Sequence, residues 1–83
     1  MKKIYVTCND RAMSGWGLAK NKINKLIIEC NDHEQADRVI KNLRKEGGYT
    51  YINYHFEKPY YTPSRYYISE YIADDAPLWN KEV

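Results

Sequence analysis

Residues 25–48 read KLIIECNDHEQADRVIKNLRKEGG, and they contain the strand-to-helix passage that decides the fold. Asn31 or Asp32 can cap a helix N-terminus, and Gly47-Gly48 follows a run of basic residues, where a left-handed residue ends a helix. Between these signals, four apolar side chains recur at the i, i+3, i+4, i+7 spacing of one helix face: Ala36, Val39, Ile40 and Leu43. The pattern predicts one amphipathic helix over about 32–46.

Strand patterns lie on both sides of this helix. Residues 3–8 (KIYVTC) and 23–30 alternate with period two, and 49–56 (YTYINYHF) is rich in aromatic residues. If the second and third strands lie parallel, joined by a right-handed crossover, the first fits between them and runs antiparallel to both. The prediction is an α+β fold of order β-β-α-β. Its single-layer sheet has strand order 2-1-3, and the helix covers one face.

The segment after Pro59 is harder to assign. Residues 65–72 (RYYISEYI) fit a fourth strand by alternation, whereas Tyr67, Ile68, Tyr71 and Ile72 also fit a helical stripe. The strand is favoured because Tyr and Ile prefer strands and prolines precede the segment. Leu78-Trp79 reads as an apolar clasp without regular structure.

The 83 residues are expected to form one domain, with a core over 1–59 and a tyrosine-rich, acidic tail over 60–83. Residues 1–45 contain ten Lys/Arg and five Asp/Glu, and residues 46–83 contain three and six. This asymmetry can attract a polyanion at the basic end, or it can hold the two halves together. No apolar run reaches the ~20 residues of a membrane span, and no signal peptide is recognised, so we expect a cytoplasmic protein of a bacterial host cell.

The sheet face opposite the helix, which we call the free face, is predicted to carry several aromatic side chains. Such a face resembles the platform on which single-stranded nucleic acids stack, with surrounding lysines for the phosphates. The alternative is that the tyrosine-rich tail folds over this face and covers it. The residues of the nucleic-acid hypothesis are Lys3, Tyr5, Lys20, Lys22, Lys25, Tyr51 and His55.

Residues 7–17 (TCNDRAMSGWG) hold a tryptophan between two glycines. Trp16 either closes the end of a small core or, together with Met13, forms an interface anchor, because Trp is enriched in binding hot spots. Basic residues on the outer face of the helix add a second candidate contact for an acidic partner. The candidate protein-binding residues are therefore Arg11, Met13, Trp16, Arg38, Lys41, Tyr60 and Tyr61.

Metal-binding and catalytic patterns are weak. Cys8, Cys30, His33 and His55 depart from paired zinc-ligand spacing, and strand alternation already accounts for both cysteines, which we expect to be reduced. A cysteine–histidine nucleophile pair would need a pocket that so short a chain hardly builds. We therefore expect no cofactor, no metal and no enzymatic activity.

Three segments, VTCNDRAMSGWG (6–17), KINKLIIECNDHEQA (22–36) and KPYYTPSRYY (58–67), resemble a family of small uncharacterised proteins from phages, prophages and conjugative elements of Gram-positive bacteria. The resemblance covers about residues 1–67 and brings no assigned activity. It implies an accessory protein of a mobile element, and such proteins often bind host machinery, as anti-CRISPR proteins do. We therefore expect a non-enzymatic protein that binds and modulates a host or element-encoded protein. Its exposed edge strands also allow a homodimer.

Overall fold

The computed structural model describes residues 3–10 and 22–81, and these residues form a four-stranded mixed sheet with one main helix packed on it. The strand order is β3-β1-β2-β4. The central strand β1 is antiparallel to both β2 and β3, and β4 is parallel to β2. The elements in chain order are β1 (Ile4–Asp10), β2 (Ile23–Cys30), α1 (His33–Glu46), β3 (Tyr49–His55), β4 (Tyr66–Ile72), a 3-10 turn η2 (Ala73–Asp75) and α2 (Pro77–Asn80).

The α+β fold, its single main helix and the 2-1-3 arrangement of the first three strands are confirmed, and 65–72 is a strand rather than a helix. The helix has its expected signals. The Asp32 side chain caps it by accepting a hydrogen bond from the Gln35 backbone N–H at 2.8 Å, and Gly47 ends it with φ +77°. A residue with a Cβ atom is strained in that left-handed conformation.

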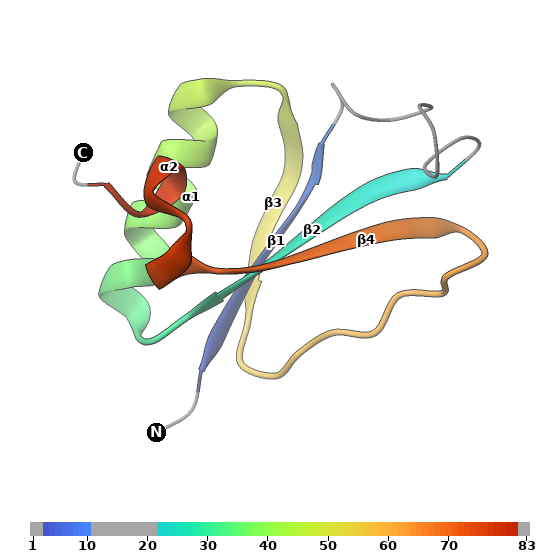
Figure 1. Cartoon of the computed structure of the whole chain (residues 1–83), viewed down its shortest axis with the longest axis horizontal. Coiled ribbons are helices and arrows are strands. Elements are labelled where there is room, and N and C mark those ends of the chain that lie inside the picture. Colours follow the sequence, from blue (N-terminus) through green and yellow to red (C-terminus); the bar gives the residue numbers. More distant parts are fainter. Residues whose placement is uncertain (1–2, 11–21, 82–83) are drawn as a thin grey trace.

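The core lies between α1 and one face of the sheet, as Figure 1 shows. The strands contribute alternate residues, such as Val6 and Ile28, and the helix contributes Val39 and Leu43; all four are fully buried. Cys8 and Cys30 belong to the same core as free thiols.

The C-terminal residues pack beside α1 instead of crossing the free face. Ala73, Ala76 and Trp79 are part of the core, and α2 lies along α1 (Figure 1). The Asn42 side-chain amide donates hydrogen bonds to the backbone oxygens of Trp79 (2.7 Å) and Lys81 (2.8 Å). Trp79 therefore acts as the expected clasp, but within a one-turn helix, whereas its neighbour Leu78 is 50% exposed and does not take part.

Two further details differ from the expectation. Strand β1 continues to Asp10, two residues beyond the predicted end, because Asn9 and Asp10 pair with Thr50 and Tyr49. The register of β1 and β3 then shifts between Thr7 and Asn9, so that β3 carries one extra residue there. This is a β-bulge.

Candidate functional site

Three aromatic side chains form an exposed cluster at the β3 edge of the sheet. We call His33, Tyr54 and Phe56 the edge aromatic cluster. Their rings meet edge to face, with centroid distances of 6.1 Å (His33–Tyr54), 5.6 Å (His33–Phe56) and 5.8 Å (Tyr54–Phe56). Tyr54 is 50% exposed and Phe56 55% exposed. Two large rings thus remain half in solvent, although they belong to the same side of the sheet as the core.

The width of the helix explains this exposure. Tyr54 pairs with the core residue Val6 across β1 and β3, so its side chain points to the α1 side. A helix with its side chains is about 10–12 Å wide and strands are spaced about 4.8 Å apart, so one helix covers about two strands. Helix α1 reaches the first part of β3, where Tyr49 and Ile52 pack against the core, but farther along the chain the rings of Tyr54 and Phe56 meet its first residue, His33, and stay half exposed.

The backbone of β3 is also open on its outer side. Among residues 3–10 and 22–81, β3 pairs with β1 and with no other strand. Tyr49–His55 contains no Lys, Asp, Glu, Arg or Pro, which natural edge strands commonly use to prevent pairing with another chain. Of the features that prevent an edge strand from pairing with another chain, β3 has only the bulge. A shallow hollow continues from the strand along residues 54–59.

The free face is partly covered by the loop between β3 and β4, which passes below the sheet in Figure 1. The Lys25 ammonium lies 4.8 Å from the Tyr61 ring centroid and 6.0 Å from that of Tyr66, and it donates to Asn9 Oδ1 at 2.9 Å. Lys25 is only 8% exposed, and burial lowers its pKa. The alternative of a covered free face is therefore correct for this part of the sheet, although the loop rather than the C-terminus covers it.

Two residues of the nucleic-acid hypothesis, Tyr5 and His55, are direct partners across β1 and β3 on the free face, and the other described ones are separated from them. Tyr5 lies half-buried on the free face, and His55 Nε2 is 3.2 Å from the Thr7 hydroxyl. Tyr51 sits at the bulge with φ +54°, so it does not continue the alternation assumed for it. Lys3 donates to Asn31 Oδ1 at 2.6 Å. Lys22 is half-buried before β2, and Lys20 lies outside the described residues.

Of the predicted protein-binding residues, the four that the structure describes lie on α1 and on the loop after β3. Arg11, Met13 and Trp16 lie outside the described residues. The Arg38 guanidinium contacts Glu34 (3.5 Å) and Asn80 (3.3 Å), and Lys41 is exposed on α1. Tyr60 is exposed on the loop, and Tyr61 is half-buried against Tyr66 and Lys25.

The edge aromatic cluster is not among the residues predicted from the sequence. Alternation along 49–56 places Tyr54 and Phe56 on the side of the sheet opposite His55, which is the side that the helix covers. The available signal was the strand order itself, because order 2-1-3 already places 49–56 at an edge that one helix is too narrow to cover.

The four residues considered for zinc serve other roles. Burial raises the pKa of the Cys8 and Cys30 thiols to about 12, which keeps both protonated, and His33 packs on aromatic rings. Within residues 3–10 and 22–81, no three His, Cys, Asp or Glu side chains gather closely enough to hold a metal ion. No helix in this part of the chain is long and apolar enough to cross a membrane.

Comparison with protein-family models, with curated proteins and with solved structures found no match.

Proposed function

We propose that this chain is a non-enzymatic binding protein of a mobile element and that it modulates a host protein through the β3 edge. The observation that supports the proposal is the edge aromatic cluster beside a strand whose outer backbone pairs with no other strand among the residues that the structure describes. Exposed aromatic patches mark interaction sites, and aromatic anchors commonly dominate binding energy.

The edge suits a partner that adds an extended segment. In strand addition, main-chain hydrogen bonds supply affinity and side-chain contacts supply specificity. A partner strand beside β3 would meet the outward N–H and C=O groups, and its side chains would contact Tyr54 and Phe56. The resemblance to mobile-element accessory proteins suggests that the partner belongs to a bacterial defence system such as CRISPR-Cas.

Binding of single-stranded nucleic acid is the less favoured alternative. Lys25 is covered, and Glu29 and Glu70 stand on the free face near Tyr5, where their charges would repel phosphates. That alternative predicts salt-dependent quenching of tyrosine fluorescence by oligonucleotides. A titration that stays flat at low salt would eliminate it.

The proposal is tested by partner capture from a Gram-positive host lysate with three chains in parallel. The chains are the unchanged protein, the double variant Tyr54→Ser/Phe56→Ser, and the control Tyr60→Ser, which alters a tyrosine that is 81% exposed on the loop. We expect a partner that is retained by the unchanged chain and the control and lost by the double variant. With the purified partner, the Kd should rise by about 30-fold or more, as for a hot spot of about 2 kcal/mol.

A partner that binds all three chains equally would refute the role of this edge. Circular dichroism must show that the double variant is folded, as we expect for two half-exposed side chains. Light scattering separates the homodimer alternative, because a dimer through β3 would dissociate in the double variant without any other protein present.

A further inference from the structure

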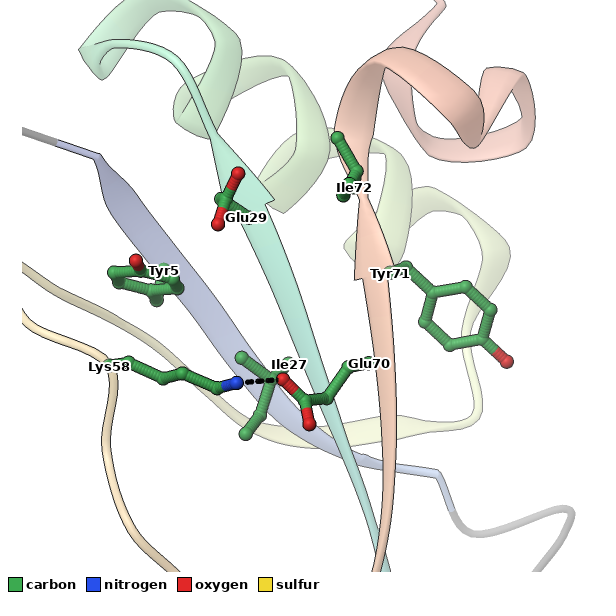
Figure 2. A pocket seen from close by; sticks show the side chains of 7 residues that line it. All are labelled: Tyr5, Ile27, Glu29, Lys58, Glu70, Tyr71 and Ile72. Atoms are coloured by element: carbon green, nitrogen blue, oxygen red, sulfur yellow. Dashed lines mark ion pairs between the residues drawn. The ribbon is translucent and has the colours of Figure 1, made fainter.

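A pocket on the face opposite α1 is lined by residues that have no part in the proposed function. Figure 2 shows it between β1, β2 and β4, with Lys58 reaching in from the loop after β3. Its volume is about 270 Å³. Tyr71 also lines it, but the ring of Tyr71 points away from it. The side chains that face it are Tyr5, Ile27, Glu29, Lys58, Glu70 and Ile72.

The strand register fixes these side chains beside one another. Tyr5 is the direct partner of Glu29 across β1 and β2, and Glu29 is in turn the partner of Ile72 across β2 and β4. Ile27, which is buried, pairs with Glu70 in the same way. Side chains at paired positions project from the same face of a sheet. The pocket therefore has an apolar floor, one aromatic wall and two carboxylates.

The two carboxylates differ in their partners. Glu70 forms an ion pair with Lys58, whose ammonium it contacts directly (Figure 2). The side chain of Glu29 forms no hydrogen bond or ion pair among residues 3–10 and 22–81, although the Lys58 ammonium lies near enough to interact with its charge. Lys58 thus illustrates the kind of group that the pocket can hold. Its alkyl chain lies near Ile27, and its ammonium contacts the Glu70 carboxylate. Near Glu29 the same apolar surface and the Tyr5 ring are present, but among the described residues no cation contacts this carboxylate directly.

We propose that this pocket binds an alkyl ammonium or alkyl guanidinium group, with the cation between Glu29 and the Tyr5 ring and the alkyl chain on Ile27 and Ile72. A cation gains from the carboxylate and from the face of an aromatic ring. An anion meets two carboxylates against one ammonium, and a purely apolar ligand would desolvate Glu29 without compensation. The volume equals that of about nine water molecules at ~30 Å³ each, which admits a four-carbon chain with its head group.

The test is an NMR titration of the full chain with n-butylammonium, with butyrate as the anionic control of similar shape. We expect saturable shifts of the Tyr5, Glu29 and Ile72 amides with a Kd in the millimolar range, and no such shifts with butyrate. Glu29→Gln should raise the Kd by about threefold or more, whereas Glu46→Gln, an exposed carboxylate at the end of α1, should leave it unchanged.

Lys58→Met should change the Kd for butylammonium in the opposite direction. It removes the resident cation and leaves Glu70 available to the ligand, so the Kd should fall by about threefold or more. Lys58 is exposed, and Glu29 is half-buried and keeps its size and shape in Glu29→Gln, so we expect both variants to fold, which the amide spectra will show. Absence of saturable shifts, an unchanged Kd in Glu29→Gln, or a raised Kd in Lys58→Met would each overturn the proposal.

The cation can come from a small amine or from a lysine or arginine side chain. A parallel titration with Nα-acetyl-lysine amide distinguishes these sources. Binding of both probes indicates that the head group and chain suffice, and binding of butylammonium alone indicates a free amine. The pocket lies on the opposite side of the sheet from the edge aromatic cluster and shares only Lys58 with the hollow next to that cluster, so Tyr54→Ser/Phe56→Ser should bind butylammonium as the unchanged chain does.

Discussion

The position of Trp79 predicts that the C-terminal turn holds a large share of the stability of the fold. Its side chain is 8% exposed and meets the rings of Tyr49 (6.4 Å between centroids) and Tyr71 (5.0 Å) edge to face. Replacing a buried tryptophan by alanine costs about 3–5 kcal/mol. At ~0.05–0.15 kcal/mol per residue, a chain of 83 residues has a total of about 4–12 kcal/mol. Trp79→Ala should therefore remove at least about a quarter of the stability.

Urea denaturation followed by circular dichroism measures this loss as a lower transition midpoint. Leu78→Ala is the matched control, because the neighbouring Leu78 is 50% exposed and should cost less than about 1 kcal/mol. In thermal unfolding each kcal/mol corresponds to about 4–8 °C for a domain of this size. If Trp79→Ala costs no more than Leu78→Ala, the C-terminal turn does not pack on α1 as described.

Two further predictions concern ionisable groups. Because burial raises the pKa of Cys8 and Cys30 to about 12, an aromatic disulfide reagent should react with these thiols only after unfolding; rapid reaction of the native chain would contradict their burial. The side-chain amides of Asn31 and Gln35 donate hydrogen bonds to the Asp74 carboxylate, and these bonds, that of Asn31 most strongly, lower the pKa of this carboxyl from its ordinary value of 3.8. The stability that this charged form contributes is present above about pH 3.8 and is lost as pH falls through the lower folded pKa. Asp74→Asn should therefore lower the urea midpoint at neutral pH and flatten its decrease in acid; an identical acid profile would show that Asp74 has no such role.

The predictable part of the fold rests on local patterns. The stripe Ala36, Val39 and Leu43 identifies the helix and its buried face, and Gly47 identifies its end. The alternation of the strands, combined with the crossover rule, also places β1 between β2 and β3. These features depend on residues close in the sequence or on the handedness of the crossover, so they can be predicted from the sequence alone.

The remaining features depend on contacts between distant residues. The parallel pairing of β4 with β2 joins segments about 40 residues apart, and no residue pattern in β4 specifies which edge it joins. Trp79 lies in a helix of four residues, too short to show periodicity. Alternation assigns Tyr54 to a face of the sheet but does not say whether the helix reaches that far. The bulge in β3 likewise interrupts the alternation, so Tyr51 does not take the place on the free face that the alternation predicts.

Amide hydrogen exchange along β3 of the dilute, unbound protein tests most directly whether this strand is an open edge. Successive amides of an edge strand point alternately toward the neighbouring strand and away from it. We therefore expect every second amide over Asn53–His55 to exchange rapidly while the amides between them, and those of the central strand β1, are protected. Uniform protection across these β3 amides would mean that another strand already covers the edge, and the proposed binding surface would not exist.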